Sequence, residues 1–344
     1  MQAEIPVAPA SSAARSASPR GHLPTLDALR GIASLAVCWF HYTNAEFTEQ
    51  FPRYQATGKY GWLGVHIFFV ISGFVIPLSM YRARYQIAAF FRFMLKRIAR
   101  LDPPYLTSVA LVVLGTWLSS LLPGHTHYHI PWTEVAAHLG YLNAFLGMPW
   151  MQMTYWSLAI EFQYYLFVGL CFPLLAWNRR VSPVLILGLF GVLTLLAGKS
   201  EALLPHYLPL FAMGVLTFRH ECLKVRRYDA IASLLVAFGL AVWIDGWLQA
   251  SVALAACLAI RFVHIDNPVL NFFGRISYSL YLLHAFLGNI LFGLAIRWAG
   301  TGPFLQWSLQ FIILLVAIGA AYVFYRLVEL PSRALSGRIS YKVR

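Results

Sequence analysis

Three ionisable side chains lie inside apolar stretches of the sequence. Arg30 and His41 stand in LDALRGIASLAVCWFHY, and Glu161 stands in TYWSLAIEFQYYLF. Such groups are costly in an apolar medium unless they are paired or face a cavity, and they are therefore candidates for function. A histidine beside a carboxylate at low dielectric is a common general base for taking a proton from a hydroxyl group. These residue types therefore indicate acid–base chemistry within apolar segments.

The spacing of these residues predicts how they face one another. Eleven residues of α-helix separate Arg30 from His41 by about 16 Å and about 20° of rotation, so both side chains lie on one face. Asp27 can pair with Arg30 from that face. Glu161 lies about 12 Å from the outer end of its helix, a depth comparable with that of His41. We therefore expect a His41–Glu161 pair, with a purely structural hydrogen bond as the alternative.

A basic segment spans residues 81–104, where six basic residues are mixed with apolar ones. Arg92, Lys96 and Arg100 recur at every fourth position, as on one face of an amphipathic helix, and Arg97 lies beside them. One interpretation is a helix resting on anionic membrane lipid. The other is a surface that binds phosphate groups, because arginine forks and lysine charges suit a polyphosphate. The two interpretations are compatible.

Four further polar residues are candidates for lining a cavity. Tyr278, Tyr281 and His284 fall within two helical turns of FGRISYSLYLLH, and Ser72 lies among glycines in GWLGVHIFFVISGFVI. Small residues in the second motif suit close helix packing. No nucleophile-elbow context surrounds Ser72, so we do not expect it to act as a nucleophile.

The sequence predicts no metal site. His125, His127 and His129 alternate in the segment HTHYH, but no carboxylate or cysteine lies beside them. The four cysteines lack the close spacing of metal ligands, and we expect them to be reduced: Cys38, Cys171, Cys222 and Cys257.

The elements that must position these residues are membrane-spanning helices. Of the 344 residues, 59% are hydrophobic and only 11% are charged, and the mean hydropathy is +0.64. That composition excludes a soluble globular enzyme. It predicts an all-α polytopic bundle of about ten spans. The expected spans are 26–45, 61–81, 105–122, 153–177, 181–197, 205–219, 228–244, 247–262, 269–297 and 303–327.

Charge predicts the orientation of the bundle. The net charge is +13, and all but four of the 26 Lys and Arg residues lie on the side of the N-terminus if ten spans alternate. By the positive-inside rule both termini are cytoplasmic, in the inner (plasma) membrane, and the charge does not indicate nucleic acid binding. The expected organisation is a disordered cytoplasmic tail over 1–24, a transmembrane domain over 25–328 and a basic cytoplasmic tail over 329–344.

Five segments together resemble acyltransferase family 3, whose integral membrane enzymes modify surface carbohydrates and other molecules with acyl groups from cytoplasmic acyl-CoA. They are LDALRGIASLAVCWFHY, with an Arg-ten residues-His spacing, GWLGVHIFFVISGFVI, KRIARLDPPY, TYWSLAIEFQYYLF and FGRISYSLYLLH, in this order over residues 26–284.

The resemblance implies roles for individual residues. It places His41 at the reaction centre, Arg30 near the acyl donor, and Arg97 and Arg100 in the basic cytoplasmic motif. It also implies that Glu161 is the intramembrane acid. An acidic residue is expected where His66 stands, which leaves the role of that position open.

The function expected from the resemblance is O-acylation, with acetyl as the expected group, of a glycan or lipid-linked saccharide. Acyl-CoA is the cosubstrate, and no permanently bound cofactor is expected. CoA would bind Arg30, Arg92, Lys96, Arg97 and Arg100. His41 would act as general base supported by Glu161, with an acyl-histidine intermediate as a variant. Some relatives carry an extracytoplasmic hydrolase-like domain, so a separate extracytoplasmic transferase is an expected partner if the chain does not act directly.

The expected path for the acyl carrier is a cavity continuous from the arginine cluster to His41. The first, second, fourth and ninth spans would line it, and the small residues Ala33 and Val37 would leave room along the first span.

A transporter or flippase is the alternative function. Arg30, His41 and Glu161 would then form a proton or substrate pathway. The sequence shows no convincing internal repeat, and hydrolysis of acyl-CoA without an ion gradient would separate the two functions.

Overall fold

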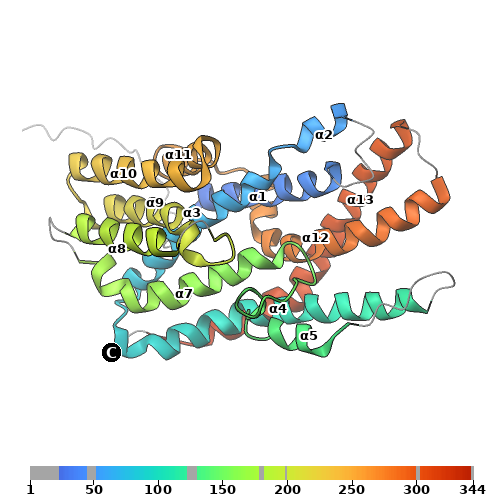
Figure 1. The fold of residues 1–344 in the computed structure, drawn as a ribbon, viewed down its shortest axis with the longest axis horizontal. Helices are drawn as coiled ribbons and strands as arrows, with labels where there is room; N and C mark the ends of the chain where they lie inside the picture. Colours follow the sequence, from blue (N-terminus) through green and yellow to red (C-terminus); the bar gives the residue numbers. More distant parts are fainter. Residues whose placement is uncertain are drawn as a thin grey trace, which may run out of the picture.

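The computed structural model describes residues 23–44, 52–121, 130–177, 182–197, 200–299 and 303–341. Over these ranges every regular element is helical and no strand occurs, which confirms the all-α fold (Figure 1). Residues 1–22 of the tail predicted over 1–24, the histidines of HTHYH and the last three residues lie outside these ranges.

A helix occupies each of the ten ranges expected to span a membrane. These helices are α1 (Pro24–Thr43), α3 (Gly64–Arg82), α4 (Phe90–Ser120), α7 (Tyr155–Leu175), α8 (Ser182–Ala197), α9 (Leu204–Leu223), α10 (Arg227–Asp245), α11 (Trp247–Phe262), α12 (Pro268–Ala299) and α13 (Pro303–Phe324). Shorter elements are α2 (Pro52–Gly58), η2 (Gly61–Leu63), η3 (Ile87–Ala89), α5 (Trp132–His138), α6 (Asn143–Leu146), the π-helical turn η4 (Tyr325–Glu329) and α14 (Leu330–Arg338).

Six helical segments of the described chain are long and apolar enough to cross a membrane, by length and composition. Two shorter apolar helices, Pro183–Leu196 and Trp247–Phe262, accompany them. The chain is therefore a polytopic membrane protein, and the number of ten spans stays a prediction. The six segments are Pro52–Arg82, Ile87–Ser120, Tyr155–Leu175, Arg227–Asp245, Pro268–Leu294 and Trp307–Arg338.

The boundary expected before residue 105 is wrong, because α4 is continuous through Pro103 and Pro104. A proline removes one backbone donor and disturbs the preceding turn, and the sequence therefore suggests a break. Here Thr107 Oγ1 donates to the Pro103 carbonyl at 2.7 Å, and α4 packs along both α7 and α14. Tertiary contacts thus keep residues 90–104 of the basic segment and the span that follows in a single helix.

The closely packed helices α3 and α9 lie at the centre of the fold. In Figure 1, α8 to α11 gather at one side, α12 and α13 lie at the other, and α1 and α3 run between them. A Cβ atom on Gly73 of α3 would collide with the Phe211 carbonyl of α9, and one on Gly214 of α9 with the Val70 carbonyl of α3. Small residues allow such close backbone approach. The glycines therefore set the distance between α3 and α9.

We expect Gly73→Leu to destabilise the bundle by about 1–3 kcal/mol, because the new side chain must separate two backbones already in contact. Thermal unfolding of the purified chain measures the change. Gly188→Leu is the control, since a Cβ at this exposed position of α8 has no neighbour within 4 Å. Equal unfolding temperatures for the two variants would contradict the close packing of α3 and α9.

Candidate functional site

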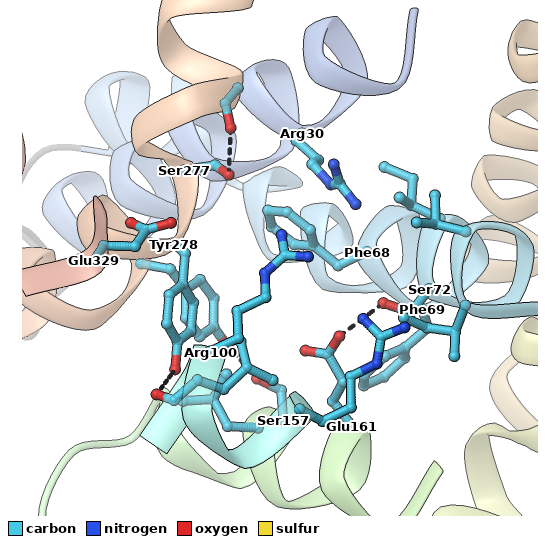
Figure 2. A pocket seen from close by; sticks show the side chains of 18 of the residues that line it. Arg30, Phe68, Phe69, Ser72, Arg100, Ser157, Glu161, Ser277, Tyr278 and Glu329 are labelled. Carbon is cyan, nitrogen blue, oxygen red and sulfur yellow. Dashed lines mark hydrogen bonds between the residues drawn. The ribbon is translucent and has the colours of Figure 1, made fainter. Parts of the chain in front are cut away.

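A large polar cavity lies between α1, α3, α4, α7 and α12, and we call it the arginine cavity (Figure 2). Its empty volume is about 1160 Å³, including its open mouth. The four spans expected to line a cavity all contribute to it, together with α4 and the last helical turns of the chain. Its polar lining comprises Asp27, Arg30, Ser72, Arg97, Arg100, Ser157, Glu161, Tyr165, Arg275, Ser277, Tyr278, Tyr281, Glu329 and Arg333.

Positive charge dominates this cavity. Five arginines line it, and only three acidic side chains do. Asp27 lies 3.5 Å from Arg30, and the buried Glu329 carboxylate lies 2.5 Å from Arg333 while accepting a hydrogen bond from Ser279. Because arginines outnumber carboxylates, the cavity suits an anionic ligand with several charges.

Two arginines of α4 extend into the cavity from the basic segment. Arg97 donates to Ser79 Oγ at 2.8 Å, while its buried Nε has no partner. Figure 2 shows the guanidinium groups of Arg100 and Arg30 both reaching into the open centre. Like charges brought together in this way are favoured when an anion lies between them. The geometry therefore provides a binding position for phosphate or carboxylate oxygens.

The other two basic residues expected at the donor site do not line the cavity. Lys96 Nζ donates to the carbonyls of Ser336 and Ile339, at 3.0 and 2.8 Å, and so binds the C-terminal end of α14. A cation at that position compensates free carbonyl groups. Arg92 is exposed on the surface of α4. The basic residues of α4 therefore differ in their surroundings: Arg97 and Arg100 line the cavity, whereas Lys96 binds α14.

Glu161 belongs to the arginine cavity and not to His41. Its Oε1 accepts hydrogen bonds from Ser72 at 2.9 Å and from Tyr165 at 2.5 Å. The expected His41–Glu161 pair is not formed, because α3 packs against both α1 and α7 and the two side chains open to different cavities. Equal depth in the bundle did not imply proximity. Ser72 serves here as a hydrogen-bond donor to the carboxylate.

His41 lines a second cavity, which we call the histidine cavity. Its empty volume is about 1010 Å³ including open space. Three imidazoles contribute to its wall, together with carboxylates and several aromatic rings. The lining residues are Val37, Phe40, His41, Trp62, Val65, His66, Met153, Thr154, Trp156, Glu201, His206, Tyr207, Ile244, Asp245, Gln249 and Tyr281.

His284 of α12 lies beside His41. The two ring centroids are 5.3 Å apart, and the Tyr281 ring is 5.8 Å from His284. His284 Nδ1 lies 3.0 Å from the Leu280 carbonyl, which only accepts, so this nitrogen carries the proton. Its buried Nε2 has no partner. His284 therefore presents a proton-accepting atom close to His41.

The two cavities meet at Val65 and Tyr281, which line both. Tyr281 is held in place, because its hydroxyl donates to the Thr154 carbonyl at 3.0 Å and shares a 2.5 Å hydrogen bond with Ser157. Tyr278 donates to the Leu101 carbonyl at 2.9 Å and lines the arginine cavity but not the histidine cavity. Val65 and Tyr281 therefore form part of the wall between the two cavities.

The path expected along the first span is closed. Ala33 and Val37 are buried, and a Cβ on Gly64 of α3 would collide with both residues. The small residues on this face of α1 serve close packing with α3, not an open channel. Residues of α3, among them Phe68 and Ser72, line the arginine cavity instead.

Several polar residues of the two cavities were missed in the sequence. Arg275 stands inside the motif FGRISYSLYLLH, and Glu329 precedes Arg333 by four residues, a spacing typical of helical ion pairs. Residues 329–338, expected within a basic tail, continue as helix and border the arginine cavity. His206 and Asp245 come from separate helices, and no local pattern joins them.

Comparisons with known proteins agree with these motifs. The family profile described as an acyltransferase domain, acyltransferase family 3, matches residues 23–326. A Staphylococcus aureus protein named as a candidate O-acetyltransferase is 28% identical over 93% of this chain and 59% of its own length, so the chain spans about three fifths of that relative.

Two further relatives differ in their extent. A peptidoglycan O-acetyltransferase of Listeria monocytogenes is 28% identical over 43% of this chain and 24% of its own length. A candidate acetyltransferase of Acidianus two-tailed virus is 25% identical over 81% of this chain and 89% of its own length. No solved structure matches. Because the profile covers most of the sequence, the chain belongs to acyltransferase family 3.

Proposed function

We propose that this chain is a membrane O-acetyltransferase that moves an acetyl group from acyl-CoA to a hydroxyl group of a glycan or lipid-linked saccharide. The observation that carries the proposal is the meeting of an arginine-rich cavity and a histidine-rich cavity at Val65 and Tyr281. Family membership and the names of the relatives support the acyl transfer. The Listeria relative is named for peptidoglycan, which supports a glycan acceptor.

The donor occupies the arginine cavity from the cytoplasmic side of the inner membrane. Arg30, Arg97 and Arg100 contact phosphate groups, because their guanidinium groups supply charge-assisted hydrogen bonds. Arg275 and Arg333 extend the same basic lining. The pantetheine arm then passes Val65 and Tyr281, so that the thioester reaches the histidine cavity.

The reaction takes place beside His41. The hydroxyl oxygen of the acceptor attacks the thioester carbonyl carbon while His41 accepts its proton. A C–O bond forms, the C–S bond breaks, and the proton passes to the leaving thiolate to give free CoA. His284 takes the supporting role first expected of Glu161: its ring lies 5.3 Å from that of His41, and its free Nε2 can accept a hydrogen bond from the imidazole when the two rings turn toward each other. Glu161 fixes Ser72 and Tyr165 at the wall of the donor cavity.

We expect Arg100→Gln to weaken CoA binding roughly tenfold to a hundredfold, because one charge-assisted contact to phosphate contributes about 1.5–3 kcal/mol. Calorimetric titration with CoA, and with CoA lacking its 3′-phosphate, measures the loss. Arg92→Gln is the matched control on the same helix, since Arg92 is exposed and does not line the cavity. Equal affinities for both variants would refute the donor role of the arginine cavity.

We expect His41→Ala to lower acetyl transfer by about 10²–10⁴-fold, because the proton acceptor is lost. CoA affinity should change little, since His41 does not line the donor cavity. Release of the CoA thiol without an ion gradient, followed in nanodiscs, measures the rate and also separates an acyltransferase from a transporter. Undiminished release by the variant would remove His41 from the mechanism.

We expect Val65→Trp to retain CoA binding but to lose acetyl transfer, because an indole at the junction would obstruct the passage between the cavities. Val65→Ala, which widens the same junction, is the matched control and should keep both activities. Calorimetry reports binding, and CoA thiol release reports transfer. Full transfer by the tryptophan variant would show that the thioester takes another path.

A further inference from the structure

A histidine–carboxylate pair lies in the wall of the histidine cavity. His206, near the start of α9, and Asp245, at the end of α10, approach to 2.8 Å between Nε2 and Oδ1. Both side chains are only 6% exposed. Because an ionised carboxylate only accepts hydrogen bonds, His206 Nε2 carries the proton and Nδ1 presents a lone pair. The pair is therefore a fixed hydrogen-bond acceptor.

This pair leaves buried polar atoms without partners. His206 Nδ1 and Asp245 Oδ2 make no hydrogen bond, and neither does Nδ1 of His66, a residue that is 5% exposed in the same wall. A buried polar atom without a partner costs stability, so such atoms are uncommon in folded proteins unless a ligand or water binds them. Three of them around one cavity indicate a ligand that brings several polar hydrogens.

Aromatic rings form much of the remaining wall. Trp156 lies against Tyr207, with ring centroids 5.4 Å apart, and Trp62 lies 5.3 Å from His66. Broad apolar surfaces with a few fixed polar atoms are typical of pockets for small organic ligands. A sugar ring fits this combination, because its C–H faces are apolar and its hydroxyl groups donate hydrogen bonds.

We propose that His206 and Asp245 form the binding subsite for the carbohydrate acceptor. One sugar hydroxyl donates to His206 Nδ1, a second donates to Asp245 Oδ2, and the ring lies against the tryptophan surfaces. The reacting hydroxyl group is thereby held toward His41, which lines the same cavity. His206 and Asp245 thus position the acceptor, and His41 takes the proton. This inference rests on the proposed acetyl transfer.

A metal ion does not explain the pair as well as a sugar does. Within the described residues, no group of three or more His, Cys, Asp or Glu side chains is arranged to hold one. A purely structural pair would not require His206, Asp245 and His66 to line one cavity together. A structural pair and a sugar subsite predict different results for a large and a small nucleophile.

The experiment compares two nucleophiles with the full chain in lipid nanodiscs and acetyl-CoA. The first is a muramidase digest of peptidoglycan, whose sugar esters are measured by mass spectrometry. The second is hydroxylamine, which is too small to span the cavity and reacts with a thioester without prior deprotonation; the acetohydroxamate formed in empty nanodiscs is subtracted from each value. We expect His206→Gln and Asp245→Asn each to lower the ratio of sugar ester to hydroxamate at least tenfold, as loss of a hydrogen bond from a bound sugar would.

The control is His264→Gln, at an exposed position outside the cavity, which should leave the ratio unchanged. Asp245→Asn keeps the shape of the pair, so it separates binding from folding. An equal fall of both products in both variants would show a structural pair and overturn the subsite. Hydroxamate without any sugar ester from the unaltered chain would overturn the carbohydrate assignment alone. Neither product from the unaltered chain would refute the proposed acetyl transfer itself, and the subsite with it.

Discussion

The cost of placing charge in an apolar interior governs the arrangement of this protein. Each ionisable group within the bundle must find a partner of opposite charge, a set of hydrogen bonds or an open cavity. Glu329 is satisfied by Arg333 and Ser279, and Glu161 by Ser72 and Tyr165. The arginines that remain gather around an opening that a polyanion can enter. The arginine cavity is thus the place where positive charge remains after the internal pairs have formed.

The two cavities divide the chemistry between them. One is rich in arginine and suits a phosphorylated donor, and the other is rich in imidazole and aromatic rings and suits proton transfer to and from a small organic acceptor. Val65 and Tyr281 form the wall between them. In the proposed reaction, this division keeps the charged part of the donor away from His41, which lines the other cavity.

Close helix packing holds this wall in position. The glycine contacts between α3 and α9, and the contact of Gly64 with α1, leave little freedom for α3 to move. The residues of α3 that face the arginine cavity are fixed by the same packing. The small residues of α1 that suggested a channel in the sequence therefore serve to bring the backbones of α1 and α3 together.

The sequence by itself determined the all-α architecture, the positions of the ten apolar helices and three arginines of the arginine cavity, Arg30, Arg97 and Arg100. These properties are local, because the length of an apolar stretch and the helical period depend only on residues that are consecutive in the chain. Tertiary structure decided which side chains meet: His284 beside His41, Ser72 and Tyr165 on Glu161, and His206 with Asp245. A helical period states which residues share a face but not which neighbour that face meets. That choice depends on how closely each pair of backbones can approach.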